Sequence, residues 1–273
     1  MKLLVAKSPW EIYGDPLESF LGRIVAAGYD AVEVNLFDRP EPLPEIKTLL
    51  RATGLPVIVQ INSRGPTVED QLRSLEQRYE HGLFASPLFF NCHTGRDHFS
   101  FEDNLRVFER AAELGAKHGV PILHETHRGC ALCNAPVAVR FLQALPELRL
   151  TADLSHFFCV HESDLSDQEA ALDLILVRAD HIHARVGFAE GPQVSDPRNP
   201  LHADAVARSF SLWKRIVARA RAEGRETFTA TPEFGPVGYM PLRGIEPQPV
   251  ADPWEINLWM RDALRRELGA AAG

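Results

Sequence analysis

A carboxylate and an imidazole close together in the chain are the first residues here that suggest chemistry. Residues 148–156 read Leu-Arg-Leu-Thr-Ala-Asp-Leu-Ser-His, a short β-type run that ends at Asp153 and is followed by His156 in an expected loop. A buried carboxylate is costly without a partner, and a divalent metal ion would satisfy both its charge and the imidazole lone pair. Taken alone, the stretch fits a hydrogen-bonded loop Asp and a surface His equally well.

Three other apolar runs end in the same way. Glu125 ends the run 120–125, His183 lies near the end of 180–185, and Glu233 ends 227–233. Side chains alternate between the two faces of a strand, so His183 shares a face with Arg185 and lies opposite Ile182. A strand face that meets helices should be apolar, so we expect the polar sets to point to the interior of a sheet that closes on itself.

The elements that would position these residues alternate regularly along the chain. Expected strands cover 2–7, 31–36, 56–62, 87–92, 120–125, 148–153, 180–185 and 227–233. Expected helices begin near Asp15, Glu41, Thr67, Ser100, Pro136, Ser166, Val206 and Asp252, with Asp15, Ser166 and Asp252 as N-caps. Eight strand–helix units spaced by roughly 25–35 residues predict an α/β fold, a single (β/α)8 TIM barrel, as one domain over residues 1–273.

The composition is that of an ordinary soluble globular protein. The chain has 273 residues, 45% of them hydrophobic and 24% charged, and a net charge of −8. This charge argues against nucleic acid or an anionic membrane as a partner, and no apolar run is long enough to span a bilayer. Four cysteines without an export signal do not indicate a disulfide framework, and we expect a cytoplasmic protein. Cys130 and Cys133 fit incidental loop thiols better than a zinc or redox site.

In a (β/α)8 barrel the carboxyl ends of the strands form the active face. Glu125, Asp153, His183 and Glu233 would therefore meet there as a set of mostly oxygen ligands with one imidazole. That set suits one divalent ion, Mn²⁺ or Mg²⁺ ahead of Zn²⁺ and Co²⁺. The alternative is four hydrogen-bonded polar residues without a metal, in which crowded carboxylates would repel one another.

Several short motifs carry a resemblance over nearly the whole chain. They are Gly28-Tyr29-Asp30-Ala31-Val32-Glu33-Val34, His124-Glu125-Thr126-His127, Asp153-Leu154-Ser155-His156, His181-Ile182-His183-Ala184-Arg185 and Pro232-Glu233-Phe234-Gly235. In this order they resemble the xylose isomerase-like superfamily of sugar isomerases and epimerases. That superfamily includes ketose 3-epimerases, inosose dehydratases and hydroxypyruvate isomerases, with endonuclease IV as a distant branch.

The resemblance implies a metal-dependent isomerase or epimerase whose partner is a small-molecule sugar or polyol. Glu125, Asp153, His183 and Glu233 would be the metal ligands, and His156 and Arg185 would contact the substrate. One of Glu125 and Glu233 would remove a proton next to a carbonyl, and the other would deliver a proton of its own to the metal-stabilised enediolate. Whether the outcome is an epimer or an aldose–ketose isomer stays open, as do the substrate and its phosphorylation.

Further residues near strand ends are expected to form the substrate walls or the surface. Substrate contacts are expected from Lys7, Trp10, Asn62 and His93, each of which fits a plain loop role equally well. Glu33 is expected inside the barrel in a structural hydrogen-bonding role. His98, His127, His161 and His202 are expected at the surface or in loops.

Four other functions compete with this interpretation. An endonuclease IV-like DNA repair enzyme would need additional histidines that the third strand, with Gln60 and Asn62, does not offer. An inosose dehydratase-like lyase would use the same metal site. A Schiff-base aldolase would need an activated Lys7, and a non-catalytic sugar-binding barrel would not need the glutamates. The sequence leaves the oligomeric state open, a homo-oligomer included.

Overall fold

Eight parallel strands form a closed barrel in which each strand pairs with the next and β8 pairs with β1. The computed structural model describes residues 1–12, 14–37, 39–245 and 248–269. The barrel strands are β1 (Lys2–Lys7), β2 (Ala31–Asn35), β3 (Val57–Asn62), β4 (Phe90–His93), β5 (Ile122–Glu125), β6 (Leu150–Ala152), β7 (Ala179–Ala184) and β8 (Thr227–Pro232). The predicted fold class is thereby confirmed.

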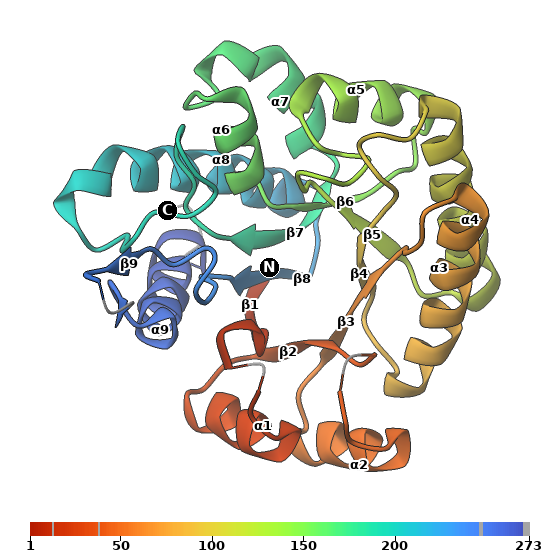
Figure 1. Ribbon diagram of the computed structural model, residues 1–273, viewed down its shortest axis with the longest axis horizontal. Coiled ribbons are helices and arrows are strands. Elements are labelled where there is room, and N and C mark those ends of the chain that lie inside the picture. The colour runs from red at the N-terminus through yellow and green to blue at the C-terminus, as the bar shows by residue number, and fades with distance from the viewer. Residues whose placement is uncertain (13, 38, 246–247, 270–273) are drawn as a thin grey trace.

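Helices surround the barrel and connect successive strands (Figure 1). They are α1 (Leu17–Ala26), α2 (Leu43–Thr53), α3 (Val68–Gly82), α4 (Phe101–His118), α5 (Ala135–Ala144), α6 (Ser155–His161), α7 (Glu169–Leu176), α8 (Ala203–Ala222) and α9 (Pro253–Leu264), with short helical turns η1 (Trp10–Ile12), η2 (Leu83–Ala85), η3 (Ser166–Gln168), η4 (Pro200–His202) and η5 (Arg265–Gly269). Among the helices described, none combines the length and apolar character that crossing a bilayer requires.

The two faces of each strand separate the core from the site. Outward residues such as Val59, Phe90 and Ile182 are buried against the helices in one large apolar cluster. Burying each such side chain stabilises the fold by about 1.5–3 kcal/mol. A smaller cluster lies inside the barrel and consists of Ala6, Ala31, Ile58, Phe89 and Leu123. Inward residues nearer the carboxyl ends of the strands are polar, so the site lies above this small apolar layer.

Two of the three expected helix caps do not form. At α1 the N-cap is Pro16 without a side-chain hydrogen bond, and Asp15 instead pairs with Arg23. At α7 the residue Ser166 lies in the turn η3, and the helix begins only at Glu169. Asp252 does cap α9, since its side chain accepts a hydrogen bond from Trp254 N. In the failed cases a local turn and an ion pair replace the cap.

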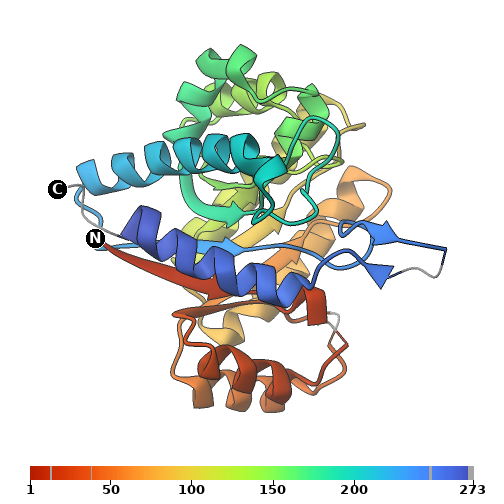
Figure 2. The same ribbon diagram turned by 90° about the vertical axis from the view of Figure 1, so that its left-hand side faces the viewer.

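Apart from the short helical turns, one helix and one two-stranded ribbon were not predicted. His156 lies in the short helix α6 and not in a loop, because the chain turns into a helix directly after Asp153. The segment after β8 contains a two-stranded ribbon of β9 (Leu242–Arg243) and β10 (Gln248–Pro249). Figure 2 shows this ribbon projecting at the end of the barrel toward which the strand arrows point.

Candidate metal centre

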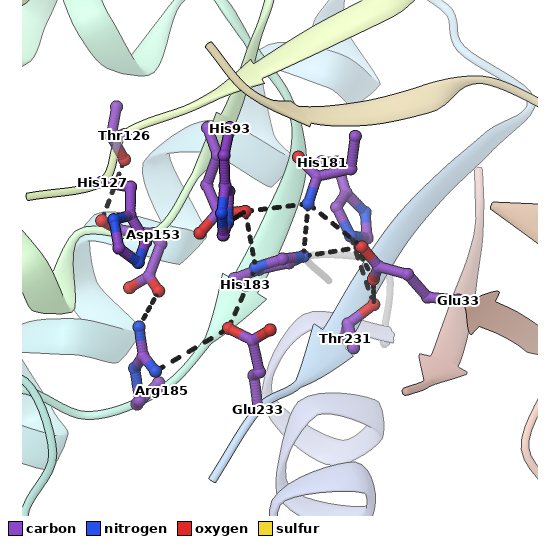
Figure 3. Close-up of polar contacts among 12 residues, drawn as sticks. Glu33, His93, Thr126, His127, Asp153, His181, His183, Arg185, Thr231 and Glu233 are labelled. Carbon is purple, nitrogen blue, oxygen red and sulfur yellow. Dashed lines mark hydrogen bonds and ion pairs between the residues drawn. The ribbon is translucent and has the colours of Figure 1, made fainter. Parts of the chain in front are cut away.

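Four acidic and imidazole side chains converge at the carboxyl ends of the last four strands. Glu125 ends β5, Asp153 follows β6, His183 lies on β7 and Glu233 follows β8. Each offers one ligand atom, and these atoms all lie within 4.8 Å of one another. All four side chains are buried, and Figure 3 shows Asp153, His183 and Glu233 directed toward a common space. This spacing would allow the four residues to hold one ion.

The imidazole of His183 is oriented by a carboxylate on its far side. Its Nε2 lies 2.9 Å from Glu33 Oε1, so Nε2–H donates to Glu33 in the neutral tautomer. Its Nδ1 lies 3.0 Å from Glu233 Oε2 and 3.4 Å from Glu125 Oε2, yet Nδ1 is buried without a hydrogen-bond partner. Metal-binding histidines are commonly held in this way by a carboxylate on the other ring nitrogen. The donor set and the unpartnered Nδ1 therefore fit a divalent cation.

Glu33 anchors a buried network beneath the four converging residues. It accepts a hydrogen bond from Thr231 Oγ1 at 2.5 Å, and its Oε2 lies 3.3 Å from His181 Nε2. His181 in turn is fixed by Thr229, 2.7 Å from its Nδ1 (Figure 3 shows the network around Glu33). Burial alone would raise the pKa of Glu33, but His183 and His181 hold it well below its usual range. The expected interior, structural position of Glu33 is thus observed.

Without a metal ion, the surrounding carboxylates favour the protonated form of His183. Burial acts to lower its pKa, but the carboxylates of Glu233, Glu33 and Glu125 outweigh burial and hold that pKa well above the usual value. Burial likewise acts to raise the pKa of Glu125, and the neighbouring His93 and His183 hold it well below the usual range. The crowded carboxylates therefore favour positive charge close by, which Arg185 supplies in part and an imidazolium or a metal ion could complete.

Arg185 forms a second buried cluster with Asp153. Its Nη2 donates to Asp153 Oδ2 and lies 2.7 Å from His156 Nε2, while its Nε donates to Ser155 Oγ at 2.9 Å. Burial raises the pKa of Asp153 to about 6, with Arg185 opposing this rise. Because Arg185 donates to His156 Nε2, the proton of that imidazole is on Nδ1, which is buried without a partner. His156 and Arg185 thus lie beside the proposed ligands.

A small cavity opens onto these groups. It has a volume of about 170 Å³ and is lined by Trp10, Gln60, His93, Glu125, His127, Arg185, Glu233 and Tyr239. The guanidinium of Arg185 stacks over Tyr239 at 4.7 Å and Trp10 at 5.3 Å from the ring centroids. Ligand pockets for drug-sized molecules have volumes of about 300–1,000 Å³, so this cavity suits a smaller compound.

Three of the residues that line the cavity were not predicted from the sequence to do so. His127 was expected at the surface, but it lies half-buried in the cavity wall because the chain turns inward after β5. Gln60 lies two residues before Asn62 on the same strand face, so strand alternation could have indicated it. Tyr239 comes from the irregular segment between β8 and α9, where no periodic pattern places it.

The expected substrate-wall residues divide into two groups. Trp10 and His93 line the cavity, whereas Asn62 ends β3 beside His93 and is not part of the wall. Lys7 is also outside the cavity: it is buried, and its Nζ pairs with Glu11 at 2.6 Å and lies 5.6 Å from the Trp254 ring. Lys7 shares the outward strand face with Val5, which explains this position. A Schiff-base role for Lys7 is therefore not supported.

Several solved structures share this fold at low sequence identity. D-allulose 3-epimerase from a Methylomonas species has 14% identity and a TM-score of 0.63, covering 98% of each chain. The probable 3-DHS dehydratase AsbF of Bacillus anthracis has 14% identity and a TM-score of 0.60, covering 86% of this chain and 93% of that one. Endonuclease IV of Thermus thermophilus has 18% identity and a TM-score of 0.59, covering 98% and 100%.

Sequence comparison gives a family assignment. Comparison with curated proteins gives no match. The family model for the xylose isomerase-like TIM barrel matches residues 21–190, which is well over half of the chain and includes Glu125, Asp153 and His183. Together with the closed eight-stranded barrel, this match confirms the resemblance noted in the sequence. The chain belongs to the xylose isomerase-like TIM barrel family.

Proposed function

We propose that this chain is a divalent-metal-dependent isomerase or epimerase of a ketose or a related hydroxy-carbonyl compound. The observation that carries the proposal is the convergence of Glu125, Asp153, His183 and Glu233, whose ligand atoms lie within 4.8 Å of one another beside a small cavity. An ion held by these four residues, Mn²⁺ in the first instance, would supply Lewis-acid polarisation of the substrate carbonyl.

Glu125 and Glu233 are the proposed proton-transfer groups. Both line the cavity, and they come from β5 and from the residue after β8, so they approach a bound substrate from different sides. Asn91 Nδ2 donates to Glu125 Oε2 at 2.8 Å and His93 Nε2 lies 3.0 Å from it, which fixes this carboxylate. One glutamate would take the proton next to the carbonyl, and the other would return a proton to the opposite face or to the neighbouring carbon.

Arg185 is the proposed group for stabilising negative charge on the substrate oxygens. Its guanidinium lines the cavity, and its Nη1 lies 4.0 Å from Glu233 Oε2. Contacts with the Trp10 and Tyr239 rings orient the guanidinium before a substrate arrives. A preorganised donor of this kind stabilises charge that develops during proton abstraction. His156, which accepts from Arg185, would hold it in place.

A small polar substrate fits this site better than DNA does. The cavity of about 170 Å³ is narrow, and the chain has a net charge of −8. Enzymes that act on DNA depend on a positively charged surface for affinity. These two features favour a sugar over the endonuclease activity of the Thermus thermophilus structure.

Deuterium exchange tests the proposal without knowledge of the natural substrate. The chain is loaded with Mn²⁺, incubated with a panel of ketopentoses, ketohexoses and inososes in D₂O, stripped of metal, and the sugars are examined by NMR. We expect deuterium at the carbon next to the carbonyl of at least one sugar. Glu125→Gln and Glu233→Gln should each slow the exchange by about two to three orders of magnitude, as for loss of a general base.

The exposed Glu18 of α1 provides the matched control, since Glu18→Gln should leave exchange unchanged. Wild-type protein that binds Mn²⁺ but exchanges no sugar proton would refute the isomerase proposal and favour a non-catalytic sugar-binding barrel. Equal exchange rates in the wild type and in both glutamine variants would show that neither Glu125 nor Glu233 transfers the proton.

A dehydratase on the same site is the second candidate. Dehydration starts with the same proton abstraction. The barrel of this chain resembles that of the probable 3-DHS dehydratase about as closely as that of the D-allulose 3-epimerase. Product analysis separates the two, because elimination yields an unsaturated carbonyl compound that absorbs in the ultraviolet and loses one water by mass. Isomerisation and epimerisation leave the mass unchanged.

A further inference from the structure

Two buried side-chain amides hold the backbone that directly follows Glu233. Asn257 on α9 accepts a hydrogen bond from Phe234 N at 2.8 Å, and its Nδ2 donates to Phe234 O at 3.0 Å. Gln193, between β7 and η4, binds Gly235 in the same way, since its Oε1 accepts from Gly235 N at 2.7 Å and its Nε2 donates to Gly235 O at 3.3 Å. We propose that Asn257 and Gln193 are positioning residues for Glu233, a role that rests on the function proposed above for that glutamate.

The carboxylate of Glu233 has few contacts of its own that would fix it. β8 ends one residue earlier, so Glu233 lies beyond the strand. In the part of the chain that the structure describes, its carboxylate accepts no hydrogen bond, and its close contacts are His183 Nδ1 at 3.0 Å and Arg185 Nη1 at 4.0 Å (Figure 3). Glu125 differs, because Asn91 Nδ2 donates to its carboxylate at 2.8 Å. The position of Glu233 therefore depends more on its backbone than that of Glu125 does.

Asn257 is fixed in one orientation by its own partners. Its Nδ2 also donates to Glu11 Oε1 at 3.0 Å, so both N–H groups and the carbonyl oxygen of the amide are used. Glu11 in turn pairs with the buried Lys7, with 2.6 Å between Glu11 Oε1 and Lys7 Nζ. The ion pair of Lys7 and Glu11 thus anchors the amide of Asn257, which gives the buried lysine a structural role away from the cavity.

Gly235 packs directly against the cavity wall. A Cβ at this position would lie 2.4 Å from two ring atoms of Trp10, so a side chain here would displace the ring. Trp10 lines the cavity, and its ring centroid is 5.3 Å from the Arg185 guanidinium. A shift of the backbone that Gln193 holds would therefore move both Glu233 and the cavity wall. A displacement of about 1 Å at reacting groups can slow a reaction by about 100-fold.

The two amides act on the site only through the backbone beside Glu233. Asn257 and Gln193 are both buried, and neither is among the residues that line the cavity. Residues that support a metal ligand from behind in this way change metal affinity or activity by about 10–100-fold. Loss of either amide should therefore weaken the ion and slow proton transfer without removing any group that would touch the substrate.

Mn²⁺ affinity, measured by titration calorimetry, tests this role without any sugar. Gln193→Met keeps roughly the length of the side chain and removes both hydrogen bonds to Gly235. We expect the Mn²⁺ dissociation constant to increase about 10–100-fold in Gln193→Met and in Asn257→Ala, and deuterium exchange at saturating Mn²⁺ and sugar to slow by a similar factor. Gln143→Met, on the exposed side of α5, is the matched control and should bind Mn²⁺ like the wild type. Circular dichroism establishes that each variant is folded.

A double-mutant cycle separates positioning of Glu233 from a general loss of structure. If Gln193 acts through the Glu233 carboxylate, Gln193→Met should weaken Mn²⁺ binding no further in a Glu233→Gln background. The same loss of affinity in both backgrounds would overturn the inference, and should Asn257→Ala fail to fold, this cycle alone decides.

The outcomes also separate failure of this role from failure of the proposed function. Wild-type Mn²⁺ affinity in Gln193→Met, or in folded Asn257→Ala, would overturn the assignment of that residue and leave the proposed function intact. A wild-type chain that binds no Mn²⁺ would overturn the proposed function and the positioning role together.

Discussion

Replacing Glu33 with glutamine tests whether the buried network beneath the candidate metal centre prepares that centre for an ion. The substitution keeps the shape of the side chain but removes the negative charge that faces His183 Nε2 at 2.9 Å. A hydrogen bond between a charged acceptor and this imidazole is about twice as strong as a neutral one. Outer carboxylates of this kind change metal affinity by about 10–100-fold, which corresponds to about 1.4–2.8 kcal/mol.

The effect can be read from thermal unfolding. At an Mn²⁺ concentration 100 times its dissociation constant, binding stabilises the wild type by about 2.7 kcal/mol. At that same concentration, a dissociation constant 10–100-fold weaker leaves only about 1.4 to 0.4 kcal/mol in Glu33→Gln. Melting curves with and without Mn²⁺, together with calorimetric titration, measure this difference, and Glu18→Gln on α1 serves as the control.

Two results would refute this reasoning. If Glu33→Gln binds Mn²⁺ within twofold of the wild type, Glu33 does not prepare His183 for the ion. If the variant loses stability equally with and without Mn²⁺, Glu33 serves the fold of the barrel interior only.

Two further predictions concern pH and packing. Because the pKa of His183 is raised, its imidazolium stabilises the metal-free protein fully below about pH 6.5, and this contribution is lost as pH rises through the folded-state pKa. Mn²⁺ must displace the same proton, so its affinity should increase about tenfold per pH unit over that rise. Titration calorimetry in buffers of different ionisation enthalpy should detect the released proton, and pH-independent binding would contradict the assignment of His183 as a ligand. Gly187→Ala should destabilise the fold by about 1–3 kcal/mol, because the added Cβ would lie 2.6 Å from Ser155 O and 2.7 Å from Ser155 Cα. Gly22→Ala on α1, where a Cβ meets nothing within 4 Å, should not lower the melting temperature, and equal losses in both variants would contradict the packing argument.

Strand alternation accounts for most of what the sequence could predict. The parity of His181, His183 and Arg185 against Ile182 identified the inward face of β7, and the same pattern applies to Glu125 and Glu233. Parallel strands in a barrel bring their carboxyl ends together, so the convergence of these residues follows from the topology. The same parity placed Lys7 with Val5 on the outward face, and applying it there would have removed Lys7 from the expected substrate contacts.

Irregular segments account for the misses. His127 and Tyr239 lie in loops whose path depends on tertiary contacts, such as the hydrogen bond from Thr126 to Asp153 and the packing of Tyr239 at 4.8 Å from Trp10. Neither contact leaves a periodic trace in the sequence. The caps expected at Asp15 and Ser166 failed because capping residues also form ion pairs and turns, and propensity does not distinguish these outcomes.

The small apolar layer inside the barrel affects the order in which ligands would bind and dissociate. Ala6, Ala31, Ile58, Phe89 and Leu123 cluster inside the barrel beneath the centre, so an ion and the proposed sugar substrate would both use the cavity as their entrance. A sugar seated in that entrance would cover an ion beneath it and delay its escape. Dissociation would then be ordered, with the sugar leaving before the ion. A chelator would remove the metal ion fastest at low sugar concentration.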